Sequence, residues 1–141
     1  MIGIESTAVA LLEPVVPLKR RRRWPTKFRD AIRGLKLGIR GHSSFFVHFF
    51  TAALVLAAGL VFQCVLLEWC ILLGCIGMVL TAELFNSAIE TLFRGLNDET
   101  KERTWPALDV SAGAVLLASL TASAIGLMIF LPKLAQWLGL S

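Results

Sequence analysis

Apolar residues recur with helical spacing between about residues 26 and 41, and basic residues fill most of the opposite arc. The apolar positions fall three or four residues apart and are Phe28, Ala31, Ile32, Leu35 and Ile39. The remaining arc carries mainly Lys27, Arg29, Arg33, Lys36 and Arg40. This pattern predicts an amphipathic helix over about 26–41, of the kind that lies on an anionic membrane surface.

Three long apolar stretches follow, at about 45–67, 69–93 and 105–131. As a helix the first would be about 34 Å long, against a bilayer core of about 30 Å, and it contains no Asp, Glu, Lys or Arg. The link between the first two stretches leaves room only for a tight turn, so they should form an antiparallel hairpin. We therefore expect an all-α membrane protein with three transmembrane helices and an N-terminal amphipathic surface helix, in one domain over 25–141. Residues 1–24 should form a basic, poorly ordered tail.

Composition and charge agree with this architecture. The chain of 141 residues is 56% hydrophobic and 17% charged, whereas a soluble domain is about 25% charged, which excludes most soluble enzymes. Of the 14 lysines and arginines, ten precede the first span, three lie between the second and third, and one follows. This asymmetry predicts a multi-pass protein of the cell inner membrane with a cytoplasmic N-terminus, and no nucleic-acid partner.

Polar residues interrupt the second apolar stretch near its cytoplasmic end. Glu83, Asn86, Ser87 and Glu90 share one face at 100° per residue, although a central carboxylate costs about 2.5–3.5 kcal/mol. Glu83 is the deeper acid, and its low-dielectric surroundings suit a general base, whereas Glu90 lies nearer water and suits a hard divalent cation. The alternative is that both acids only pair with basic residues of the surface helix or of a neighbouring subunit.

Two motifs carry a resemblance to a known family. The sequence ELFNSAIE at 83–90 and the sequence LDVSAGAVLL at 108–117 resemble the signatures E-x-x-N-[ST]-A-I-E and A-K-D-x-x-A-G-A-V-L of the prokaryotic diacylglycerol kinase family, which includes undecaprenol kinases. The resemblance extends over about 28–131 and includes His48 near the start of the first span. A histidine there is more typical of a hydrogen-bonding partner than of a metal ligand.

The resemblance implies a homotrimeric lipid kinase that transfers the γ-phosphate of ATP to a lipid alcohol with Mg²⁺ at the cytoplasmic membrane face. Diacylglycerol is the expected acceptor, and undecaprenol is the alternative. By position, Glu83 matches the general base with Asn86 beside it, and Glu90 matches a magnesium and nucleotide ligand. Further nucleotide-binding positions are Glu99, Lys101 and Asp109.

Three positions depart from the family pattern. Leu108 replaces a lysine, His42 replaces a metal-binding glutamate, and Arg94 replaces an acid. Because Leu108 cannot contact phosphate, we expect Arg94 to supply that positive charge and so to join the nucleotide-binding residues. The departures also leave open a catalytically impaired family member with a structural membrane role.

Overall fold

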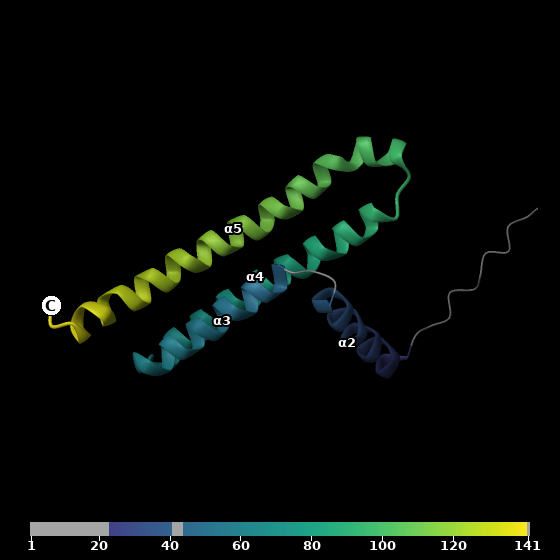
Figure 1. Ribbon diagram of the computed structural model, residues 1–141. Helices are drawn as coiled ribbons and strands as arrows, with labels where there is room; N and C mark the ends of the chain where they lie inside the picture. The colour runs from purple at the N-terminus through teal and green to yellow at the C-terminus, as the bar shows by residue number, and fades with distance from the viewer. Residues whose placement is uncertain (1–22, 41–43, 141) are drawn as a thin grey trace, which may run out of the picture. The chain divides into compact units, whose positions relative to one another are not determined.

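A computed structural model describes residues 23–40 and 44–140, and this part of the chain is helical with no strand. The helices are α2 (Trp24–Arg40), α3 (Ser44–Val61), α4 (Leu66–Arg94) and α5 (Asp98–Trp137) (Figure 1). The last three are long and apolar enough to cross a membrane. The predicted all-α membrane fold is therefore confirmed. The predicted tail lies outside the described residues up to residue 22, and His42 lies outside them as well.

Helix α3 ends earlier than the apolar pattern predicted, because a local turn closes it. The backbone N–H of Cys64 donates to the carbonyl of Gly59, and that of Gln63 donates to the carbonyl of Leu60. Gln63 has a φ of 50°. These are the two bonds and the left-handed residue of a Schellman motif, which satisfies the last carbonyls of a helix. The apolar residues that follow the turn therefore begin α4 rather than extending α3.

The start of α4 is tied to the last turns of α5. The Glu68 carboxylate accepts a hydrogen bond from the Val65 backbone N–H at 2.8 Å, which caps α4. The same carboxylate lies 3.0 Å from Lys133 Nζ on α5. We call this part of the molecule the ion-pair end. Burial and the nearby Glu68 carboxylate raise the pKa of the Cys64 thiol in the adjoining turn.

Helix α5 begins at Asp98, well before the predicted start of the third span near Trp105. Asn97 is its N-cap and accepts a hydrogen bond from the Thr100 backbone N–H at 3.0 Å. Glu99 in the first turn pairs with Arg103 at 3.0 Å. Capping and charge pairing continue the helix into a polar stretch whose composition alone indicated a connection.

Helices α3, α4 and α5 expose apolar side chains and bury polar ones. Phe46, Leu117 and Met128 are 77%, 69% and 76% exposed, whereas Glu83 is 2% exposed. This inverts the usual arrangement of a soluble protein and matches a chain whose surrounding solvent is lipid.

Helix α2, taken by itself, has the strongly amphipathic character expected of a surface helix. Trp24 and Phe28 are exposed apolar side chains. The ammonium group of Lys27 lies 4.7 Å from the centre of the Trp24 ring.

Candidate functional site

Glu83 is the most deeply buried carboxylate that the structure describes, and α3 supplies its contacts. Ser44, the first residue of α3, donates its hydroxyl to Glu83 Oε1. One turn further along α3, His48 Nε2 lies 3.7 Å from Glu83 Oε2. The predicted general base is therefore held between a hydroxyl and an imidazole. Neither group neutralises the carboxylate as a lysine or arginine would.

A second group of polar side chains joins α4 to α5. Asn86 Nδ2 donates to Glu90 Oε1 at 3.0 Å, and Arg94 donates to Glu90 Oε2 at 3.1 Å. On α5, the Ser111 hydroxyl lies 2.8 Å from Asn86 Oδ1. Asn86 and Ser111 are buried, whereas the Glu90 side chain is 35% exposed. These hydrogen bonds fix both oxygens of a carboxylate that still reaches solvent. We call the region of Glu83 and Glu90 the carboxylate end.

The two acids lie two turns apart on α4, about 10 Å along its axis. Glu83 is enclosed in the apolar part of the helix, and Glu90 lies close to the end of the helix at Arg94. Their separation and different exposure allow one to act on a group inside the membrane while the other contacts a water-soluble ligand.

The remaining predicted nucleotide residues lie on α5 in local pairs or at the surface. Lys101 pairs with Asp98 at 3.4 Å, and Glu99 pairs with Arg103. Asp109 is exposed. Within 23–40 and 44–140, no hydrogen bond or ion pair joins Glu99, Lys101 or Asp109 to the Glu83 and Glu90 groups. The structure thus brings together Glu83 with α3, and Asn86, Glu90 and Arg94 with one another.

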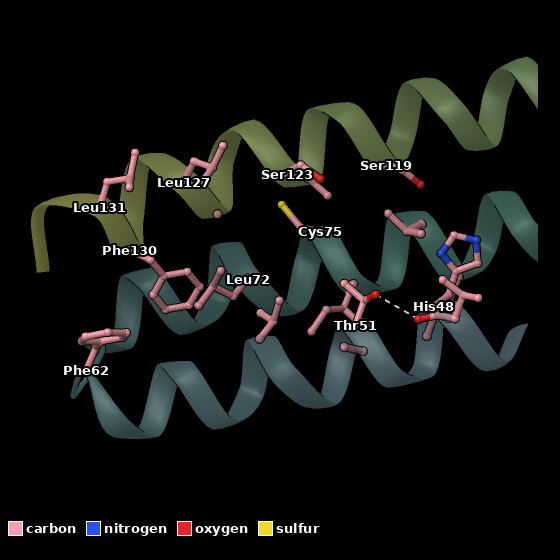
Figure 2. A pocket seen from close by; sticks show the side chains of 18 of the residues that line it. His48, Thr51, Phe62, Leu72, Cys75, Ser119, Ser123, Leu127, Phe130 and Leu131 are labelled. Carbon is pink, nitrogen blue, oxygen red and sulfur yellow. Dashed lines mark hydrogen bonds between the residues drawn. The ribbon is translucent and has the colours of Figure 1, made fainter. Parts of the chain in front are cut away.

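An apolar groove of about 680 Å³ extends from the neighbourhood of Glu83 between α3, α4 and α5. His48 lies at one end, and Phe62 and Phe130 lie at the other with ring centres 5.9 Å apart (Figure 2). The groove lining is apolar except for His48, Thr51, Ser119 and Ser123. The Thr51 hydroxyl donates to the Val47 carbonyl, and the buried Ser119 hydroxyl has no partner in the described part of the chain. Because His48 both lines the groove and contacts Glu83, one end of the groove lies near the buried carboxylate.

Of the two acids at the carboxylate end, Glu90 is the one that reaches solvent and could contact a metal ion. Among residues 23–40 and 44–140, no three His, Cys, Asp or Glu side chains gather as a complete ligand set. Mg²⁺ is commonly held by one or two carboxylates together with the phosphates of a substrate. Glu90, whose side chain is 35% exposed, could contact a cation that arrives on a nucleotide.

Most of the chain matches known proteins. The model of the family described as prokaryotic diacylglycerol kinase matches residues 29–130. The chain belongs to this family. It is 36% identical over 107 residues to the undecaprenol kinase of Bacillus subtilis (strain 168), a match that covers 76% of this chain and 87% of the relative. No solved structure gives a significant match. The chain is thus a lipid kinase of the membrane, whose family acts with ATP on a lipid substrate.

The lipid kinase also contains polar residues at its carboxylate end that the sequence motifs did not assign. These are Ser44 and His48, which contact Glu83, and Ser111, which contacts Asn86. His48 was expected to be a hydrogen-bonding partner, but its partner was not evident. Ser111 stands at a position that the second signature leaves open, and nothing local in the sequence shows which residue of α4 it meets.

Proposed function

We propose that the chain phosphorylates a polyprenol of the undecaprenol type, taking the γ-phosphate of ATP as its magnesium complex at the cytoplasmic membrane face. The observation that carries this proposal is the position of Glu83, a carboxylate that is 2% exposed and contacts His48 at one end of an apolar groove. A lipid tail in the groove would bring its terminal hydroxyl to this carboxylate.

In this mechanism Glu83 accepts the proton of the lipid hydroxyl as the oxygen attacks the γ-phosphorus. The bond between the γ-phosphorus and the bridging oxygen breaks, and ADP leaves. Ser44 and His48 orient the Glu83 carboxylate from α3. Phosphoryl transfer depends mainly on positioning and on neutralisation of charge, so two well-placed acids and a cation can supply it.

The nucleotide is proposed to contact Glu90, with Asn86 and Arg94 holding its carboxylate. The magnesium ion on the phosphates supplies neutralisation of their charge. The guanidinium of Arg94 is exposed and adjacent to Glu90, so it can provide the phosphate contact that Leu108 cannot. Glu99, Lys101 and Asp109 are proposed to contact the nucleotide from α5.

Two observations favour a polyprenol over diacylglycerol. The relative that shares 36% identity over 107 residues is an undecaprenol kinase. A polyprenol is hydrocarbon up to its hydroxymethyl group, which suits the apolar groove lining, whereas diacylglycerol carries two ester groups beside its hydroxyl. Among the polar groups of the groove lining, the Thr51 hydroxyl already donates its proton to the Val47 carbonyl of its own helix, so it does not offer that proton to an ester group.

We further propose a homotrimer in the cell inner membrane with a cytoplasmic N-terminus. The family resemblance supports the trimer, and large apolar faces of α3, α4 and α5 remain exposed in the single chain. The excess of lysine and arginine before the first span and near Arg94 supports the orientation.

The test is a phosphate-transfer assay with purified protein in mixed micelles. Radiolabelled ATP is supplied with Mg²⁺ and either undecaprenol or diacylglycerol. We expect faster labelling of undecaprenol, dependence on Mg²⁺, and loss of labelling in Glu83→Gln. Preferential labelling of diacylglycerol would overturn the proposed acceptor, and labelling of neither lipid by a folded trimer would indicate a catalytically impaired member.

A further inference from the structure

Ser111 connects α5 to the carboxylate end through a buried hydrogen bond. Its side chain is 7% exposed, and its hydroxyl lies 2.8 Å from Asn86 Oδ1. Asn86 is 8% exposed, and its Nδ2 lies 3.0 Å from Glu90 Oε1. Two consecutive hydrogen bonds therefore separate Ser111 from the carboxylate that is proposed to face the nucleotide.

The chemistry of the end group sets the direction of this chain of hydrogen bonds. An ionised carboxylate accepts hydrogen bonds and cannot donate them. Asn86 must therefore turn its Nδ2 toward Glu90, which leaves Oδ1 facing Ser111. The Ser111 hydroxyl must in turn donate, because an amide oxygen is only an acceptor. The donor of each hydrogen bond is thereby specified: Ser111 donates to Asn86, and Asn86 donates to Glu90.

The Ser111 hydroxyl has a second acceptor within reach, the Leu108 carbonyl at 2.9 Å on its own helix. A hydroxyl has one proton and donates to one of the two at a time. Donation to Leu108 would leave the Asn86 amide oxygen buried without a donor, and such a group is costly. Pairing with Asn86 satisfies both side chains and holds the amide in the orientation that Glu90 requires.

We infer that Ser111 is a positioning residue for nucleotide binding, an inference that rests on the proposed function. It acts through Asn86, whose amide it holds in place, and thereby holds the Glu90 carboxylate that is proposed to contact the nucleotide. The family signature leaves residue 111 open, so the motif by itself assigns this serine no role. A purely structural role would instead tie α4 to α5 without any effect on nucleotide affinity.

The experiment compares Ser111→Ala with Thr121→Val in the full-length protein. Thr121 is a matched control on α5, because its hydroxyl donates only to the Leu117 carbonyl of its own helix. The dissociation constant of trinitrophenyl-ATP is measured by fluorescence, with and without Mg²⁺. The KM for ATP, the KM for the lipid, kcat and the thermal unfolding midpoint are measured in parallel.

For Ser111→Ala we expect the dissociation constant with Mg²⁺ and the KM for ATP to rise about tenfold, as for other residues that orient a metal-binding side chain. The KM for the lipid should remain within about twofold of the unsubstituted value, and Thr121→Val should leave all of these constants unchanged. In an Asn86→Ala background, Ser111→Ala should change the nucleotide dissociation constant little further, because the amide that links Ser111 to Glu90 has been removed.

The inference is overturned if Ser111→Ala binds the nucleotide as tightly as the unsubstituted protein, or if its effect persists in full without the Asn86 amide. A lower unfolding midpoint with unchanged nucleotide affinity would show a structural role alone and would also overturn it. If the unsubstituted protein itself binds no nucleotide, the proposed function fails together with the inference. Tight binding by the unsubstituted protein and by Ser111→Ala rejects only the inference.

Discussion

Two glutamates of α4, Glu68 in its first turn and Glu83 further along the helix, have opposite kinds of partner. At the ion-pair end, Glu68 accepts from the Val65 backbone N–H and lies 3.0 Å from Lys133. At the carboxylate end, Glu83 contacts the Ser44 hydroxyl and the His48 imidazole, and no lysine or arginine of the described residues forms an ion pair with it. The ion pair of Glu68 ties α4 to α5, whereas Glu83, held by a hydroxyl and an imidazole, is the carboxylate proposed as the general base.

The sharpest test of this comparison replaces each glutamate by its amide. We expect Glu83→Gln to lower kcat by about 10³-fold, within the range attributed to general bases. Glu68→Gln should change kcat by less than about twofold, since Glu68 lies in the first turn of α4, far from Glu83. Both rates are measured as transfer of radiolabelled phosphate to the lipid alcohol. Equal losses in the two variants would mean that the distinction between the ends is wrong.

Charge at the carboxylate end should matter for nucleotide affinity rather than for folding. Arg94→Ala removes a guanidinium that holds Glu90 and is proposed to contact phosphate, so the KM for ATP should rise about tenfold. An unchanged KM in Arg94→Ala would remove Arg94 from the proposed nucleotide site.

At the ion-pair end, loss of a charge should lower the stability of the fold and leave nucleotide affinity unchanged. The side chains of Lys133 and Glu68 are 21% and 25% exposed, so Lys133→Met leaves a partly buried carboxylate unpaired. We expect the midpoint of unfolding in a detergent titration to fall, with the KM for ATP unchanged. Because Glu68→Gln removes the other charge, adding it to Lys133→Met should restore part of the loss.

The smallest expected effect concerns the thiol in the turn between α3 and α4. Burial and the Glu68 carboxylate raise the pKa of Cys64, so less thiolate is present at pH 8 than for an unperturbed cysteine. Glu68→Gln removes one of these causes, and maleimide should then label Cys64 modestly faster at pH 8. Labelling is followed by mass spectrometry, and a slower rate in Glu68→Gln would contradict the proposed electrostatic cause.

Local patterns predicted most of the helices but not where each one ends. The apolar stretches located α3, α4 and most of α5, because lipid exposure demands long apolar helices. Their ends depended on particular hydrogen bonds. The Schellman turn at Gln63 shortened α3, and the Asn97 cap started α5 inside a polar stretch. Hydropathy averages over many residues and does not register such single bonds.

The candidate site, like the helices, could be predicted from the sequence only in part. Helical spacing placed Glu83, Asn86 and Glu90 on one face of α4, and that inference needs only 100° per residue. The positions of Glu99, Lys101 and Asp109 could not be related to that face, because they lie on a second helix whose register against α4 depends on packing.

By itself, the sequence determined that the protein lies in lipid, how many spans it has and which acids lie in an apolar medium that penalises them. Only the tertiary structure decided which side chains meet those acids: Ser44 and His48 at Glu83, and Ser111 at Asn86. The physical reason is that periodicity specifies a face of one helix. The alignment of two helices follows from the packing of whole surfaces, in which a single buried hydroxyl can orient a distant carboxylate.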